Sequence, residues 1–284
     1  VTSQDGNWHK EYSVIIDTFD LPFQYDFEHY ELNETGKYQV FFEETQGTAL
    51  FKQYIWASGN SGFALTGVGR NPQEYPTVSI ENGIDGSRAI KLETKSTGQF
   101  GETVKMPIAA ANLFLGSFDV NNAVQKPLKA TLFGLPFGKK PLKFKGYYKY
   151  VPGTQSFKAK DKNGNTVTIS RQEDEGDIYA VLYEAAGLDG KVLDGNNVLT
   201  SKNIVALARV EVEKTDRYIE FETSFQYGER KEISWPQFIY RDPSDDGTGK
   251  YLRFSEEKMK NYEYNLAVVF TSSKYGAYFA GSVG

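Results

Sequence analysis

The sequence predicts an all-β protein, a β-sandwich of the jelly-roll type with long loops and few short helices. Three observations carry this prediction. Short alternating or continuously apolar segments recur along the chain, Gly, Asn, Asp and Pro separate them, and helical periodicity is nearly absent. Many strands joined by elaborate loops are typical of two packed antiparallel sheets.

The strand pattern recurs from the first part of the chain to its end. Apolar residues alternate with polar ones, as on a half-buried strand, or form short runs, as on a fully buried one. The predicted strands are Lys37–Glu43, Ala89–Glu93, Ala130–Phe133, Leu142–Tyr150, Thr166–Ser170, Ile178–Glu184, Ile204–Val212, Tyr218–Phe225 and Tyr264–Thr271.

Turn and helix signals lie between these strands. Asp161–Asn165 contains Asn-Gly, a strong hairpin signal, and Gly187–Lys191 and Leu193–Asn197 have similar turn chemistry. Ser255–Lys260 predicts one or two helical turns, with a serine cap followed by acidic residues. Met106–Leu113 is expected to be a short helix or a loop.

Two segments, Trp56–Pro76 and Pro236–Lys250, are longer than simple connections, and such loops are either functional or disordered. The aromatic residues of the first favour order. Near the N-terminus, Asp5–Ile16 has the pattern of a turn and a strand. We expect residues 1–20 to be a linker or the last strand of a preceding domain, and residues 21–284 to form one domain.

Composition excludes several classes. The 284 residues include no cysteine, so disulfides and thiolate metal sites are impossible. The net charge is -5 without a basic cluster, which argues against nucleic acid as a partner. No apolar run approaches the ~18 residues of a membrane-spanning helix. The chain starts at Val1 without a leader, so an export signal or lipid anchor is expected upstream, and a monomer is expected.

Motifs for catalysis are weak. A nucleophilic triad is not supported, because Gly-x-Ser-x-Gly is absent and the two histidines lie near the N-terminus. Jelly-roll glycosidases that retain configuration use two carboxylates ~5 Å apart. Glu184 is a weak isolated candidate, for which a rim salt bridge is the commoner role. The acid pairs with strand spacing, each compatible with a solvated face, are Asp26/Glu28, Glu211/Glu213 and Glu220/Glu222.

No cofactor is predicted. Arg241–Lys250 contains three aspartates, so a site for a structural calcium ion in this segment is one alternative. It lacks the spacing and the closing glutamate of a helical calcium loop, so a solvated turn is the default.

Sugar binding has a clearer residue logic, because the faces of sugar rings stack on aromatic side chains held by a rigid scaffold. The chain has 19 Tyr and 20 Phe, and most of these side chains are expected to pack in the core of a sandwich. Tyr54–Gly67 combines Trp56 and Asn60 with small residues. Lys145–Gly153 places Tyr148 and Tyr150 on one strand face, and because one face must be core, at most half of its residues can meet a ligand.

Five segments in order resemble the putative carbohydrate metabolism domain family of Bacteroidetes. They are WASGNSGFALTG, IAAANLFLGSF, LFGLPFGKKPLKFKGYYKYVPG, DIYAVLYEA and LAVVFTSSKYGAYFAGSVG. The resemblance implies a jelly roll behind an immunoglobulin-like domain, export to the cell surface or periplasm, and a concave-face sugar pocket, without an established reaction. The pocket residues it implies are Trp56, Asn60, Tyr148, Tyr150, Tyr179, Lys274 and Tyr275.

The last matching segment changes from an apolar run, Leu266–Phe270, to the polar residues Thr271–Lys274. At the end of a strand, such hydroxyls commonly bind backbone groups of loops. Alternatively, Ser272, Ser273 and Lys274 border a sugar pocket.

Three functions remain open: non-catalytic binding of a poly- or oligosaccharide, a jelly-roll glycoside hydrolase or lyase, and a structural or adhesion protein.

Overall fold

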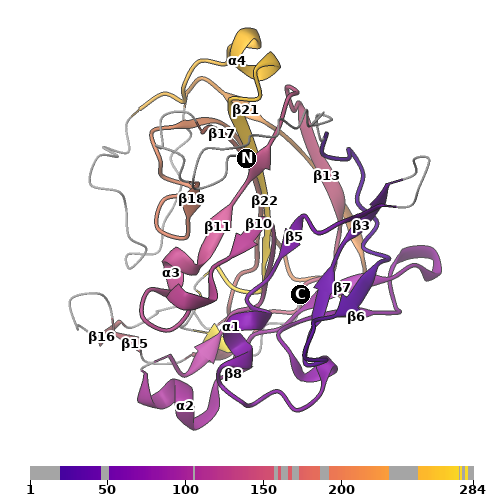
Figure 1. Ribbon diagram of the computed structural model, residues 1–284, viewed down its shortest axis with the longest axis vertical. Helices are drawn as coiled ribbons and strands as arrows, with labels where there is room; N and C mark the ends of the chain where they lie inside the picture. Colours follow the sequence, from indigo (N-terminus) through magenta and orange to yellow (C-terminus); the bar gives the residue numbers. More distant parts are fainter. Residues whose placement is uncertain are drawn as a thin grey trace, which may run out of the picture.

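The computed structural model describes residues 20–45, 51–104, 106–156, 159–160, 166–167, 173–185, 192–229, 249–274, 276 and 279–280. Strands dominate these residues and the helices are few and short, so the all-β sandwich prediction is confirmed. The centre is one antiparallel sheet that curls into a half-barrel (Figure 1).

The main sheet runs in the order β18, β11, β10, β22, β17, β19 and β21, while β5 and β12 pair with β10 and β22. Its strands are β5 Trp56–Ala57, β10 Asn112–Phe118, β11 Thr131–Phe133, β12 Leu135–Pro136, β17 Asp177–Glu184, β18 Leu193–Asp194, β19 Ile204–Val210, β21 Gln226–Tyr227 and β22 Tyr264–Thr271.

Both faces of this sheet are buried, which explains the nearly continuous apolar strands. Successive side chains of a strand point to opposite faces. On β17, Ala180 and Leu182 pack into one hydrophobic cluster, and Tyr179, Val181 and Tyr183 pack into the other. The strands at the centre therefore have a core on each side, and neither face can be polar.

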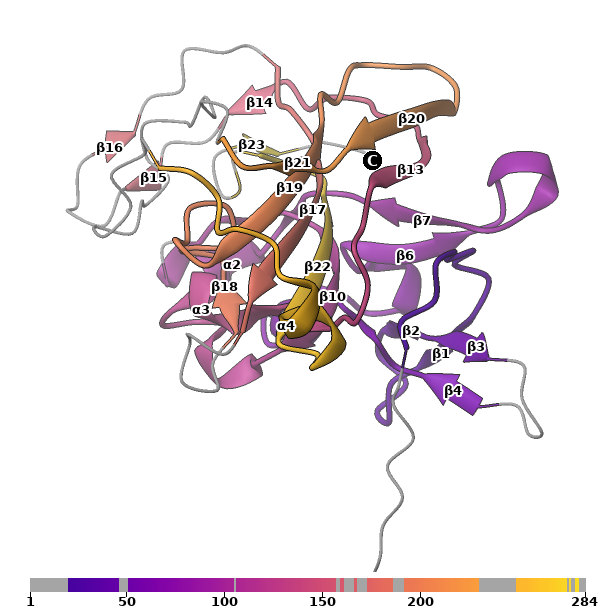
Figure 2. The same cartoon turned by 90° about the horizontal axis from the view of Figure 1, so that it is seen from above.

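Two-stranded sheets complete the fold. In Figure 2, β6–β7, β3–β4 and β13 lie together on one side of the main sheet. The bounds of the pairs are β1 Tyr30–Leu32 with β2 Gln39–Phe41, β3 Glu43–Thr45 with β4 Phe51–Gln53, β6 Thr77–Ile80 with β7 Ala89–Leu92, β8 Lys95–Ser96 with β9 Ile108–Ala109, β13 Lys143–Tyr148 with β20 Ile219–Ser224, β14 Gln155–Ser156 with β23 Phe279–Ala280, and β15 Ala159–Lys160 with β16 Thr166–Val167.

The helices lie in connections between strands. Helix α4 confirms the predicted turns, because the Ser255 hydroxyl caps it by accepting a 3.3 Å hydrogen bond from the Lys258 N–H. Met106–Leu113 is neither helix nor simple loop but holds β9 and the start of β10. The helices are α1 Asn60–Ala64, α2 Gly98–Thr103, α3 Pro127–Ala130 and α4 Glu256–Lys260, with 3₁₀ turns η1 Pro72–Glu74, η2 Ile84–Gly86 and η3 Val120–Asn122.

Several sequence features lie outside the described residues. They are the segment Asp5–Ile16, the turns Asp161–Asn165 and Gly187–Lys191, and nearly all of the aspartate-rich segment before Lys250. Within the described ranges, no helix has the length and apolar character that a membrane span requires.

Candidate functional site

Trp56 lies inside the molecule beside a buried carboxyl group. The residue is 4% exposed, and its indole N–H donates a 2.7 Å hydrogen bond to Oε1 of Glu43. The ring of Tyr25 meets the indole edge-on, with ring centres 5.1 Å apart. Burial raises the pKa of Glu43 to about 7, and the negative charge of Asp26 adds to this effect. In this structure Trp56 binds an interior acid and presents no free face to solvent.

Asn60 joins helix α1 to strand β6. Its side-chain Nδ2 donates to the Thr77 carbonyl at 2.7 Å, and its Oδ1 accepts from the Thr77 N–H at 3.1 Å. Asn60 has no exposed surface. Both ends of the amide are therefore engaged in holding the fold.

The tyrosines in β13 and just after it differ in burial, which shows which of them face the core. Tyr148 is 9% exposed and Tyr150 is 4% exposed, whereas Tyr147 is 57% exposed. The Tyr148 hydroxyl accepts a 3.1 Å hydrogen bond from the Glu213 N–H, and the Tyr150 hydroxyl donates to the Ser272 carbonyl at 3.3 Å. The face shared by Tyr148 and Tyr150 is thus the core face.

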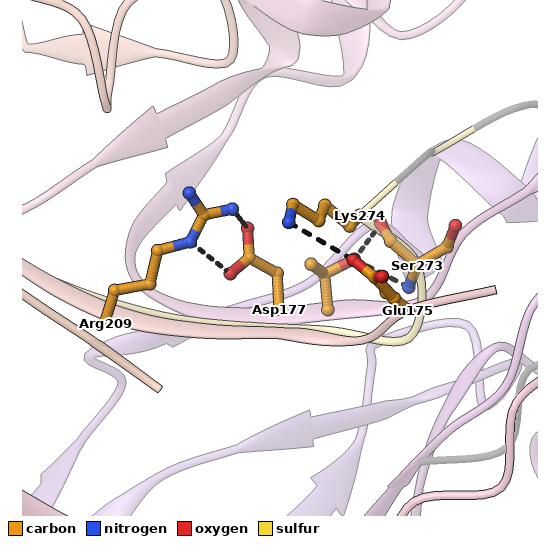
Figure 3. A network of polar contacts seen from close by, with 6 residues as sticks. Glu175, Asp177, Arg209, Ser273 and Lys274 are labelled. Atoms are coloured by element: carbon orange, nitrogen blue, oxygen red, sulfur yellow. Dashed lines mark hydrogen bonds and ion pairs between the residues drawn. The ribbon is translucent and has the colours of Figure 1, made fainter. Parts of the chain in front are cut away.

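A polar network lies where β17, β19 and β22 come together (Figure 3). Arg209 donates from Nε to Oδ1 of Asp177 at 2.8 Å and from Nη2 to Oδ2 at 2.7 Å. This bidentate pair is largely removed from water, since Asp177 is 6% exposed. Tyr179, the cross-strand neighbour of Arg209, is buried in the hydrophobic cluster on one face of the sheet.

The same network includes the residues after β22. The Lys274 ammonium lies 3.2 Å from Oε2 of Glu175, and the backbone N–H of Lys274 donates to the Glu175 carbonyl at 2.5 Å. The Ser273 hydroxyl donates to Oδ1 of Asp174 at 2.9 Å. These contacts hold the residues that follow β22 against the segment that precedes β17.

The hydroxyls that end β22 bind backbone groups, which is their ordinary role. The Thr271 hydroxyl donates to the Ala111 carbonyl at 3.0 Å, and the Ser272 hydroxyl accepts from the Ala111 N–H at 3.0 Å. Tyr275 lies outside the described residues, so its predicted role as a pocket residue stays a prediction.

Of the predicted sugar-contacting residues that the structure describes, none lines the cavity at the β21 edge of the main sheet. A ring or amide enclosed by packed side chains cannot stack on or bind a sugar without displacing them. That they line a pocket stays a prediction, and the contacts above give most of them a structural role. The predicted sugar-contacting residues that are buried are Trp56, Asn60, Tyr148, Tyr150 and Tyr179.

The acids singled out in the sequence also have structural partners or exposed positions. Oε2 of Glu184 lies 2.7 Å from the Lys258 ammonium, which is the predicted rim salt bridge. Glu222 pairs with Lys143, and Glu28 accepts a 2.8 Å hydrogen bond from a backbone N–H. The other acids of the spaced pairs are exposed: Asp26, Glu211, Glu213 and Glu220. In the described part of the chain, no three acidic or histidine side chains cluster closely enough to hold a metal ion.

A cavity of about 420 Å³ lies at the β21 edge of the main sheet. It combines aromatic rings with cationic side chains. Its lining residues are Lys140, Tyr227, Gly228, Lys250, Tyr251, Leu252, Arg253 and Phe254.

Two aromatic rings and a lysine define the geometry of this cavity. The ring centres of Tyr227 and Phe254 are 5.9 Å apart, and the ring planes are nearly perpendicular, at 86°. The Lys140 ammonium lies 5.1 Å from the first ring centre and 4.9 Å from the second. The two perpendicular rings of Tyr227 and Phe254 form an aromatic corner. A ligand bound there would contact aromatic rings next to the positive charge of Lys140.

Hydrogen bonds fix the backbone around the cavity. The Tyr227 hydroxyl donates to the Pro141 carbonyl at 2.7 Å and so holds the loop that carries Lys140. The N–H of Tyr251 donates to the Gly228 carbonyl at 2.6 Å. Burial raises the pKa of Tyr227, so its hydroxyl stays a neutral donor.

The sequence patterns do not single out Tyr227, Phe254 or Lys140, which line this cavity. Both aromatic residues lie beside charged or small residues, in FQYGER and YLRF, as expected for partly exposed rings. That signal was available, but only the fold brings β21, the β12–β13 loop and the segment before α4 together.

Comparisons with known proteins agree with this fold. A structure from Bacteroides thetaiotaomicron VPI-5482, described as a putative glycoside hydrolase, is 38% identical with a TM-score of 0.73, and the match covers 99% of this chain and 74% of that one. A structure from Bacteroides vulgatus ATCC 8482, described in the same words, is 32% identical with a TM-score of 0.70, and the match covers 91% and 93%.

No curated protein matches the chain. The family model that matches is described as a putative carbohydrate metabolism domain, and it spans residues 26–284, nearly all of the sequence. The chain therefore belongs to the putative carbohydrate metabolism domain family.

Proposed function

We propose that the protein binds a poly- or oligosaccharide in the cavity between Tyr227 and Phe254. The observation that carries this proposal is the aromatic corner, because sugar rings present C–H faces that pack on aromatic rings. Membership of a carbohydrate-related family supports the same class of ligand.

Affinity electrophoresis and calorimetry with a panel of polysaccharides test this proposal. Tyr227→Ala and Phe254→Ala should each weaken binding about tenfold, or ~1.4 kcal/mol, because each removes one wall of the corner. Tyr227→Phe keeps the ring and should bind nearly as the wild type does. Tyr147→Ala is the matched control, since Tyr147 is 57% exposed and lies outside the cavity lining.

Melting temperatures separate lost binding from lost folding, because Phe254 also stacks on Tyr264 at 5.5 Å. Absence of binding to every polysaccharide would refute the proposal. Unchanged affinity in both folded alanine variants would refute it as well.

Glycoside hydrolysis is the second candidate, and Glu43 is the observation that favours it. At pH 7 a carboxyl group with a pKa of about 7 is protonated in about half of the molecules, as a general acid requires. Glu43 is 6% exposed, so a substrate could reach it only if the side chains that enclose it moved. The two similar structures described as putative glycoside hydrolases support this class. Release of reducing ends should then disappear in Glu43→Gln and persist in Glu44→Gln. No release from any polysaccharide that binds would set hydrolysis aside.

We also propose that the protein acts at the cell surface or in the periplasm, held by a lipid anchor. The family resemblance supports this location. Fractionation of the source cells and protease shaving should place it in the envelope, and recovery in the cytoplasmic fraction would contradict the proposal.

A further inference from the structure

The charges around the cavity are opposite in sign to the net charge of the chain. Among the described residues, the lining includes Lys140, Lys250 and Arg253 and no acidic side chain, while the whole chain carries a net charge of -5. In the part of the chain that the structure describes, one acid lies nearby, since Oε1 of Glu229 is 3.8 Å from the Lys250 ammonium. That pair is highly exposed and weak, so it leaves the cavity positive.

Lys140 differs from the lysine next to it. The Lys139 ammonium lies 3.7 Å from Oδ2 of Asp20 and 4.1 Å from the ring centre of Phe23. Among the described residues, neither Lys140 nor Arg253 has a carboxylate oxygen within 4.0 Å. Two of the three cations of the cavity, Lys140 and Arg253, therefore have no carboxylate partner within the described ranges and can bind an anion from outside.

The backbone that carries these cations is held in place. The Tyr227 hydroxyl bonds to the carbonyl of Pro141, the residue after Lys140, and the N–H of Leu252 donates to the Ile204 carbonyl at 2.8 Å. In these two segments, side-chain torsions rather than the backbone must therefore be ordered when a ligand binds, which lowers the entropic cost.

We propose that the cavity selects a saccharide that carries an anionic group, either the carboxylate of a uronic acid or a sulfate ester. A sugar ring packed on Phe254 would bring such a group within reach of the Lys140 ammonium and the Arg253 guanidinium. Arginine binds a planar carboxylate, or two oxygens of a tetrahedral sulfate, through paired N–H donors, and lysine supplies a point charge. This inference rests on the proposed saccharide binding and specifies its ligand class.

The experiment compares three oligosaccharides of equal length, one neutral, one containing uronic acids and one sulfated, by calorimetry in a series of salt concentrations. Lys140→Met and Arg253→Met remove a charge and keep much of the apolar stem. Lys139→Met is the matched control, because that lysine is adjacent in sequence and engaged with Asp20. At least one anionic ligand should bind, more weakly as salt rises, and each cavity variant should lose about fivefold or more in affinity.

The outcomes separate this inference from the proposal on which it rests. Binding of the uronic-acid or the sulfated ligand, lost in Lys140→Met and kept in Lys139→Met, supports it and identifies the group. Preference for the neutral ligand, sensitive to Tyr227→Ala but not to Lys140→Met, overturns the anionic specificity and leaves saccharide binding intact. Absence of binding by all three overturns both.

Discussion

Glu43 shows how one buried side chain sets the response of the protein to pH. It is 6% exposed, and its pKa is raised to about 7, mainly by burial, while the unfolded chain titrates near 4.5. Between these values the folded state binds more protons than the unfolded state, so stability decreases as pH rises. The stability from the neutral carboxyl is fully present below about pH 4.5 and is lost by the time the pH exceeds about 7.

Glu43→Gln should therefore stabilise the protein at pH 8 by an amount on the order of 2 kcal/mol and have little effect at pH 4.5. Glutamine keeps an oxygen acceptor for the Trp56 indole but cannot ionise. Urea unfolding at several pH values measures the effect, with Glu44→Gln, an exposed neighbour, as control. Equal stability of wild type and Glu43→Gln at pH 8 would show that this carboxyl is not destabilised by burial.

At the scale of elements, hydrogen bonds between neighbouring segments decide what a predicted site residue does. Asn60 was expected to contact a sugar, and the structure places it between α1 and β6 with both amide ends bonded to Thr77. Its type and setting, beside glycine and serine, suit either role. Burial distinguishes the two, and burial depends on strands that the local sequence does not specify.

Asn60→Ala should lower the free energy of unfolding by about 2–3 kcal/mol, since it leaves two buried backbone groups of Thr77 without partners. Saccharide affinity should be unchanged, because Asn60 is absent from the cavity lining. Denaturant unfolding and calorimetry give the two readouts. A variant of normal stability with impaired binding would restore the predicted role of Asn60 as a sugar ligand.

For the whole molecule, the sequence predicts best those strands whose two faces are both buried. β22 begins at Tyr264 and ends at Thr271, as predicted, because nearly every side chain in it is apolar. β10 was missed, and it contains Gly116 in a left-handed conformation, with φ 142°. A Cβ atom at Gly116 would lie 2.0 Å from the Leu132 carbonyl oxygen of β11, so glycine is required there by a contact that the local sequence cannot reveal.

The candidate site was less predictable than the fold for the same reason. Alternation shows that Tyr147 and Tyr148 point to opposite faces of β13, but not which face meets the core. The cavity joins Lys140, Tyr227 and Phe254 from separate parts of the chain. Their proximity follows from the order of strands in the main sheet, which sequence patterns do not determine.

That strand order also predicts which strands resist local unfolding longest. β17 is paired along its length with β22 and β19 and buried on both faces, whereas β3 and β4 form a separate two-stranded sheet with exposed Glu44 and Lys52. Hydrogen exchange followed by mass spectrometry should find β17 and β22 amides protected at least about 100-fold more than those of β3 and β4, because the hairpin can open without global unfolding. Destabilising the whole protein with urea should accelerate β17 strongly and β3–β4 little. Equal protection of the two regions would mean that the hairpin and the main sheet unfold as a single cooperative unit.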